Sequence, residues 1–150
     1  MVLDNRLLAD LYGQSLIETQ GKYAWMGGRA KPILIVVSEE KAPFISPEDL
    51  PFLTRILGAC KLTIDEVALF NLATHPAADP EDWLAFFSPR IVISFGVLPA
   101  QLGLPVDFPR YQLQAIKGST YMHAASFTLL AAELEERKQC WTSLKRLFNL

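Results

Sequence analysis

The sequence predicts an α/β protein, a three-layer α/β/α sandwich in which helices cover both faces of a short, mostly parallel sheet. The first supporting observation is that short β-branched runs alternate with amphipathic helical segments along the chain. The second is that 150 residues, of which 51% are hydrophobic and 20% charged, suit one globular domain with a sizeable core. We therefore expect a single domain over residues 1–150, with a helix and loop in 1–30 and the core in 31–150.

The first thirty residues predict a helix followed by a connecting loop. Leucines recur at roughly helical spacing over Leu3–Thr19, and Gln20–Lys22 interrupts the pattern. The segment Tyr23–Gly28 combines aromatic residues with glycines, which favours a loop folded over the edge of the core. The alternative is a recognition loop in which Tyr23 and Trp25 contact a partner, because aromatic side chains beside flexible glycines suit peptide contact.

Apolar runs predict the strands of the core. The continuous β-branched run Pro32–Val37 is typical of a strand buried on both faces of a parallel sheet. Two further apolar runs, Val67–Leu72 and Arg90–Phe95, predict a second and a third strand. A fourth strand is expected over Tyr111–Ile116. Right-handed crossovers would place the carboxyl ends of these strands at one edge of the sheet.

Capping residues and apolar stripes predict the helices between the strands. The first helix begins at Ser46 or Asp49 and presents an apolar stripe to the sheet, formed by Leu53, Ile56, Leu57 and Cys60. A short helix follows Asp79, and another is closed by Gly103. The longest helix is expected over Phe127–Phe148, with a broadly one-sided stripe of Leu130, Leu134, Trp141, Leu144 and Phe148.

Composition excludes several classes of function. The formal net charge of −2 argues against a protein held on nucleic acid mainly by phosphate contacts, although weak DNA binding through one local patch is compatible with it. Apolar runs fall short of the ~20 residues that span a bilayer, and the N-terminus has no signal pattern. We expect a cytoplasmic protein without membrane contact, in which Cys60 and Cys140 are buried free thiols.

The sequence predicts neither a metal nor a cofactor. The candidate metal ligands are His75, Asp79, Glu81 and His123, but their spacing matches no ligand motif. Gly27-Gly28 precedes the first core strand, whereas a phosphate-binding glycine loop follows one. Ser126 lacks a nucleophile elbow. Glu39 and Glu40 follow the first core strand, where they either solvate a loop or supply a base that activates water beside a histidine.

Polar or small residues occur where the predicted strands end. The first core strand runs into Ser38–Phe44, the second ends near Asn71, and the third runs into Gly96. His123–Ser126 immediately precedes the last helix, which carries Lys138, Trp141 and Lys145. Ligands of α/β proteins gather outside the carboxyl ends of the strands, so a site is predicted at this edge.

These segments resemble the uracil-DNA glycosylase superfamily over about Pro32–Phe148. Its first-strand loop has the pattern G-x-x-P-G-x-x-[DE], followed by Pro-Phe, and Ser38–Phe44 occupies that place. Its second strand ends in an asparagine that recognises the base, which matches Asn71. Its third strand runs into a glycine and a short helix, as at Gly96. Its last motif, His-Pro-Ser before a helix with Lys and Trp, matches His123–Ser126.

The resemblance implies a glycosylase-like fold in which, in an active member, His123 and Asn71 contact the base and Glu39 or Glu40 holds the water. Here the first-loop glycines that bring the backbone to a flipped base are replaced, and Ala124 replaces the proline after the histidine. These departures predict a catalytically degenerate member that acts by binding. Its candidate contact elements are the Tyr23–Gly28 loop and the strand-end edge that carries Glu39, Asn71 and His123. The candidate contact residues are Tyr23, Trp25, Phe44 and Ser126.

A second resemblance is to the psi subunits of bacterial DNA polymerase III, clamp-loader accessory proteins that look like inactive relatives of this fold. An N-terminal segment, an apolar strand, a proline-rich loop and a capped helix follow in the same order, and Thr63–Val67 matches a short link of that family. This resemblance implies a protein partner in DNA replication or repair. The alternative is an active DNA glycosylase that removes uracil or another damaged base by hydrolysing the N-glycosidic bond.

Overall fold

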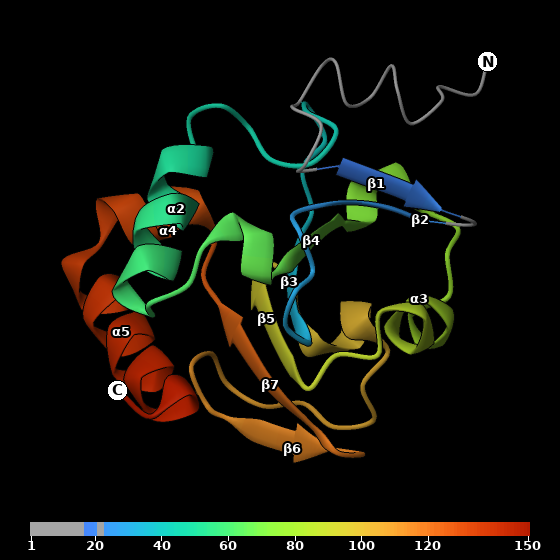
Figure 1. Ribbon diagram of the computed structural model, residues 1–150. Helices are drawn as coiled ribbons and strands as arrows, with labels where there is room; N and C mark the ends of the chain where they lie inside the picture. The colour runs from blue at the N-terminus through green and yellow to red at the C-terminus, as the bar shows by residue number, and fades with distance from the viewer. Residues whose placement is uncertain (1–16, 21–22) are drawn as a thin grey trace.

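A computed structural model describes residues 17–20 and 23–150 of the chain (Figure 1). The described strands are β1 (Ile17–Gln20), β2 (Tyr23–Met26), β3 (Ile33–Val37), β4 (Ala68–Asn71), β5 (Ile91–Phe95), β6 (Gln114–Ile116) and β7 (Ser119–Ala124). The α-helices are α2 (Leu50–Ala59), α3 (Pro80–Phe87), α4 (Phe127–Ala132) and α5 (Leu134–Phe148). Short 3₁₀ turns are η1 (Ile64–Glu66), η2 (Leu72–Thr74) and η3 (Pro99–Leu102).

The strands form one mixed sheet with the order β1-β2-β4-β3-β5-β7-β6. The pairs β4–β3, β3–β5 and β5–β7 are parallel, whereas β1–β2, β2–β4 and β6–β7 are antiparallel. The α/β class is confirmed, but the expectation of a mostly parallel sheet is wrong. Three of the predicted core strands, β3, β4 and β5, form the parallel centre together with β7, and antiparallel strands on both sides make the sheet mixed.

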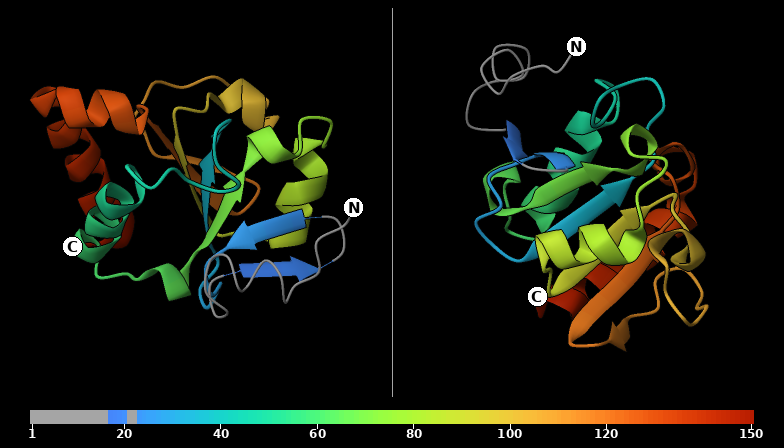
Figure 2. Two further views of the ribbon diagram at one scale, coloured as in Figure 1. Left: turned by 90° about the horizontal axis from the view of Figure 1, so that it is seen from above. Right: turned by 90° about the vertical axis from the view of Figure 1, so that its right-hand side faces the viewer.

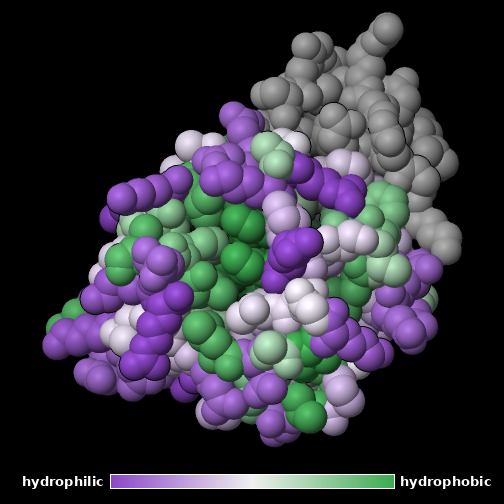
Figure 3. Space-filling model, turned by 60° about the horizontal axis from the view of Figure 1, so that its bottom comes forward, coloured by the Kyte–Doolittle hydropathy of each residue, from purple (hydrophilic) through white to green (hydrophobic). Residues whose placement is uncertain are grey.

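Two hydrophobic clusters lie on the two faces of the sheet. One contains Ile35 of β3 and the buried residues of α2, α4 and α5, and the other contains Val36 of β3 and the buried residues of α3. Figure 2 shows the corresponding separation of these helices (left panel). Successive side chains of a strand point to opposite faces, so the uninterrupted apolar run of β3 supplies both clusters. On the face drawn in Figure 3, hydrophilic side chains surround apolar ones gathered in a central hollow.

The N-terminal part differs from the predicted helix and loop. Of the helix predicted over Leu3–Thr19, residues 1–16 lie outside the described part of the chain, and Ile17–Gln20 forms a strand. The predicted aromatic loop is also a strand, since Tyr23–Met26 pairs with β1 along its length and touches β4 at Met26. Tyr23 and Trp25 alternate along β2, as residues packed on one face of a strand do. Gly27 and Gly28 come after the strand and therefore do not interrupt it.

The C-terminal helix is broken where the sequence predicts continuity. Glu133 adopts an extended conformation (φ −117°, ψ 113°) between α4 and α5. Arg137 stabilises this break, because its Nη1 donates to the carbonyl oxygens of Leu130 (2.8 Å) and Ala131 (2.9 Å) at the end of α4. The predicted stripe is split in consequence, and Leu134 is 57% exposed.

The segment predicted as a fourth strand is mostly a loop, and the strand beside β5 comes later in the chain. Only Gln114–Ile116 of that segment forms a strand, and it pairs antiparallel with β7. β7 includes His123, which was expected after a strand and not within one. The other core elements match their predictions, including α2 with Asp49 at its N-cap and α3 with Asp79.

Candidate functional site

The carboxyl ends of the four parallel strands meet at one edge of the sheet, as the sequence predicts. The register pairs Val37 with Asn71 and Ser94 with His123, so these ends are level with one another. From β3 the chain passes to β4 on one side, and then to β5 on the other. Ligands of open α/β sheets bind at such a reversal of strand order, which here lies between the ends of β3 and β5.

A cavity of about 200 Å³ occupies this reversal point. Its lining comes from the last residues of β3 and β5, the residues that follow them, the segment that leads into α2, and the start of α4: Val37, Ser38, Glu39, Ile45, Asp49, Phe95, Gly96, Ser126, Phe127 and Thr128. The structure therefore brings together two of the predicted site residues, Glu39 and Ser126. Asp49 and Thr128 were missed as site residues, although their positions at helix starts beside the sheet edge could have indicated them.

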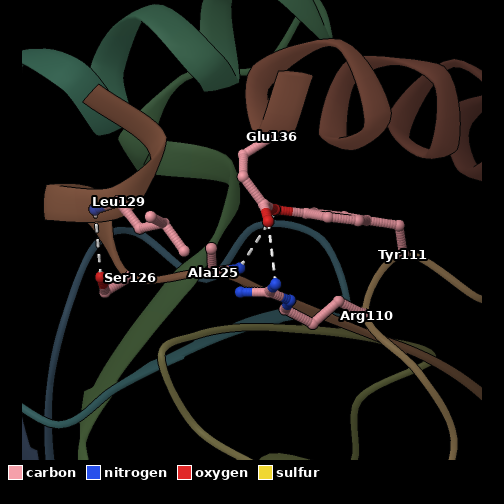
Figure 4. Close-up of polar contacts among 6 residues, drawn as sticks. All are labelled: Arg110, Tyr111, Ala125, Ser126, Leu129 and Glu136. Atoms are coloured by element: carbon pink, nitrogen blue, oxygen red, sulfur yellow. Dashed lines mark hydrogen bonds and ion pairs between the residues drawn. The ribbon is translucent and has the colours of Figure 1, made fainter. Parts of the chain in front are cut away.

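Gly96 and Ser126 set the width of this cavity. Gly96 has a φ of +70°, and a Cβ atom there would lie 3.3 Å from the Cβ of Ser126. A larger residue would thus be strained by its backbone and crowded by α4. Ser126 caps α4 by accepting a hydrogen bond from the Leu129 N–H (3.2 Å), as Figure 4 shows. Its side-chain oxygen is already engaged, although the residue is exposed.

The Asn71 side chain is fully used in holding the loop that follows β3. Its Oδ1 accepts from the N–H groups of Glu39 (2.8 Å) and Ala73 (3.1 Å). Its Nδ2 donates to the carbonyl oxygens of Glu39 (2.8 Å), Pro43 (3.1 Å) and Ala42 (3.2 Å). Asn71 is 0% exposed. An amide with two donors and one carbonyl has no remaining capacity for a ligand in this arrangement.

His123 is also buried and hydrogen-bonded within the protein. It is 5% exposed, its ring lies edge-on to Phe108 at 5.3 Å, and its Nε2 lies 2.6 Å from the Phe108 carbonyl oxygen. A carbonyl oxygen only accepts, so Nε2 carries the proton and donates. The histidine thereby anchors the loop that joins η3 to β6.

Asn71 and His123 point to opposite faces of the sheet. Leu69, two residues before Asn71, belongs to the cluster beneath α2, whereas His123 contacts Phe108 in the cluster beneath α3. Residues two apart on a strand share a face. Both residues occupy the predicted edge, but their side chains do not converge on one substrate.

A second hollow, of about 500 Å³, lies on the other side of the β3 end. Glu39 lines it as well, together with Glu40, His75 and the buried Trp83. Burial lowers the pKa of His75 below its usual 6.5, and its ring stacks on Phe70 at 5.3 Å. Within the described residues no hydrogen bond joins Glu39 to either histidine, and its Oε1 instead accepts from the Lys41 N–H (2.9 Å). The base-and-histidine pairing considered from the sequence is therefore not formed here.

The predicted contact residues Tyr23, Trp25 and Phe44 are all buried. The Tyr23 hydroxyl donates to Asp82 of α3, and this hydrogen bond together with burial raises the tyrosine pKa to about 12. Trp25 packs against Phe86 and Phe87 of the same helix. These aromatic residues join β2 to α3, so Tyr23–Gly28 is not an exposed recognition loop.

A polar cluster that the sequence does not reveal ties the β6 side of the molecule to α5 (Figure 4). The Tyr111 hydroxyl donates to Glu136 and accepts from the Ala125 N–H (3.3 Å), and Arg110 forms an ion pair with Glu136 (2.8 Å). Burial, followed by the hydrogen bond to Glu136, raises the pKa of Tyr111. These residues are distant in sequence and form no motif, which explains why they were missed.

Cys60 and Cys140 are buried free thiols, as predicted, and burial raises the pKa of Cys60 to about 11 and of Cys140 to about 12. The described residues contain no group of three or more metal-ligating side chains. No helix in the described part of the chain is long and apolar enough to cross a membrane. Comparison with protein-family models gives no match, and comparison with curated proteins gives none either.

Proposed function

We propose that this chain is a catalytically inactive, glycosylase-like protein of the cytoplasm that serves as a binding or adaptor subunit in DNA replication or repair, similar to the psi subunits. The observation that carries the proposal is the disposition of Asn71 and His123. Each is buried and bonded within the protein, and they point to opposite faces of the sheet. This arrangement gives the two side chains no common position from which to act on one base, which supports an inactive protein.

The finer fold assignment, a three-layer sandwich of the uracil-DNA glycosylase type, is part of this proposal. It is supported by the order in which family-like segments follow the parallel strands. The Ser38–Phe44 loop follows β3, Asn71 ends β4, Gly96 follows β5, and Ser126 caps the helix after β7. The presence of helices against both sheet faces also agrees with it.

The inactive state is supported by the small size and polar lining of the cavity at the β3–β5 ends. At about 200 Å³ it is smaller than the ~300–1,000 Å³ of typical small-molecule sites. A flipped base would need stacking surface and hydrogen-bond partners for its edge. The asparagine that the family resemblance assigns to base recognition is occupied by the loop backbone.

The enzyme hypothesis is tested by incubating the full chain with single-stranded and double-stranded DNA that contains uracil or other damaged bases. Abasic sites are converted to strand breaks with alkali and counted on a gel. We expect no breaks above a protein-free control. Cleavage that disappears in His123→Ala, while a correctly folded Lys138→Ala control retains it, would overturn the proposal in favour of a glycosylase.

The adaptor hypothesis is tested with the purified, tagged full chain in a native lysate of its source. Bound proteins are identified by mass spectrometry, and each candidate is then purified and mixed with the chain in size-exclusion chromatography. Co-elution with a replication or repair protein is the expected result. Recovery of nothing above the tag-only background, or of unrelated proteins alone, counts against the adaptor role.

A further inference from the structure

An apolar groove lies between α2 and α5, away from the sheet edge discussed above. Its volume is about 190 Å³, and its walls include Phe52 and Ile56 from α2 and Trp141 and Leu144 from α5. Trp141 remains 37% exposed, whereas the other two tryptophans are buried. A large aromatic side chain left accessible in an apolar groove is a common anchor point for a partner protein.

The groove carries positive charge at its margins. Arg55 and Arg137 line it, with the Arg55 guanidinium 5.6 Å from the Phe52 ring centroid. Lys145 lies over Trp141 at 5.9 Å. No acidic residue lines this groove, and the ion pairs within the described residues, Lys31–Glu66 and Arg110–Glu136, lie elsewhere. Arg55 is therefore available to a carboxylate of another molecule. Arg137 uses its Nη1 to hold the end of α4, and no hydrogen bond within the described residues engages its Nε or Nη2.

The dimensions of the groove restrict what it can bind. A volume of about 190 Å³ is below that of a typical small-molecule site and suits a single large side chain. The cationic margins favour an anionic neighbourhood for that side chain. A short peptide segment satisfies both conditions, because one residue can enter the groove while its neighbours remain at the rim.

We propose that this groove binds an acidic peptide segment of a partner protein, which inserts one aromatic or large aliphatic side chain beside Trp141 and Ile56. Carboxylates on either side of the inserted residue pair with Arg55 and Arg137. The inference rests on the proposed adaptor function and specifies the chemistry of the partner. The contact surface is then the helical face and not the strand-end edge.

The test uses a fluorescein-labelled peptide of sequence Glu-Glu-Leu-Phe-Glu-Glu and fluorescence anisotropy with the full chain. We expect saturable binding that weakens as salt is added, because exposed ion pairs are screened. Matched peptides with Ser-Ser in place of Leu-Phe, or with Lys in place of each Glu, should bind at least about tenfold more weakly. Equal binding of all three peptides, or no saturable binding, overturns the proposal.

Variants of the protein test whether the peptide binds in this groove. Arg55→Glu and Trp141→Ala should each weaken binding about tenfold or more, since they reverse a rim charge and remove the anchor. Lys138→Glu makes the same charge change as Arg55→Glu on α5 outside this groove, where it lines a different hollow, and should alter binding by less than about threefold. Equal losses in Arg55→Glu and Lys138→Glu would indicate general charge attraction and would contradict a groove-specific site.

The same variants separate this inference from the adaptor role. If a replication or repair protein co-elutes equally well with the unmodified chain, Arg55→Glu and Trp141→Ala, the adaptor role stands and the groove is not its contact. If the peptide binds in the groove but no such protein is recovered, the groove proposal stands and the adaptor role fails. Circular dichroism of each variant confirms that it is folded.

Discussion

The strand-end edge and the α2–α5 groove use their side chains in opposite ways. At the edge, Asn71 and His123 are buried and bonded to the protein's own backbone. In the groove, Trp141 is partly exposed and Arg55 has no ion pair within the described residues. The polar side chains at the edge that the family resemblance points to are hydrogen-bonded within the protein, and the binding site that we propose lies on the helical face. Sequence position alone would have assigned these roles the other way round.

The largest effect is expected from Asn71→Leu. The change leaves the partly buried N–H of Glu39 and the carbonyls of the following loop without the Asn71 amide, and each group that stays unsatisfied out of contact with water costs ~1–3 kcal/mol. We expect a loss of about 3 kcal/mol or more in urea unfolding, with faster tryptic cleavage after Lys41. Thr74→Val removes one neighbouring hydrogen bond, to the Asn71 carbonyl, and should cost about 1 kcal/mol or less. Similar values for both variants would contradict a central role for the asparagine.

His123→Phe should produce an intermediate effect. It preserves an aromatic ring beside Phe108 and removes the hydrogen bond to the Phe108 carbonyl. A buried acceptor that loses its donor costs ~1–2 kcal/mol, which is measurable by chemical unfolding. An unchanged unfolding free energy would show that this hydrogen bond does not stabilise the fold.

Several elements around the edge can be predicted from the sequence because their signals are local. β3, β4 and β5 are predictable because both faces of each strand are buried, which demands continuous apolar runs. α3 is predictable because Asp79 accepts from the Glu81 N–H and Pro80 suits the first turn. Each of these signals lies within a few neighbouring residues, so it can be recognised in the sequence without knowledge of the fold.

Other features depend on contacts between distant segments and escape sequence analysis. The break at Glu133 has no proline or glycine to mark it, and it depends on Arg137 reaching back to α4. The face on which a strand residue points changes with a shift of one position. The sequence could therefore place Asn71 and His123 at one edge without revealing that they face away from each other.

The burial of His75, on the α3 side of the strand-end edge, predicts how the stability of the protein depends on pH. Burial lowers the pKa of His75 in the folded protein below its usual 6.5, so the unfolded chain binds more protons as the solution becomes acidic. The histidine's contribution to stability is complete above pH 6.5 and is lost as the pH falls below that value. His75→Phe should flatten this part of the curve in urea unfolding between pH 7.5 and 5. An identical pH dependence in both proteins would exclude His75 as its source.

The smallest effect on stability is expected in the groove. Arg55→Glu changes an exposed residue whose interaction is a cation–π contact with Phe52, worth ~0.5–1 kcal/mol at exposed sites. We expect the free energy of unfolding, measured by thermal denaturation, to change by less than about 1 kcal/mol. Peptide binding should be lost as described above. A loss as large as that of Asn71→Leu would show that the groove serves the fold as much as the edge does.

The hairpin that ends the sheet at β6 has a consequence for behaviour at high concentration. Lys117 and Gly118 both have positive φ (50° and 85°), the backbone of a tight two-residue turn that matches the twist of paired strands. The turn returns the chain after only the three residues of β6. So short an outer strand offers a neighbouring molecule few unpaired N–H and C=O groups, which guards this margin against edge-to-edge aggregation.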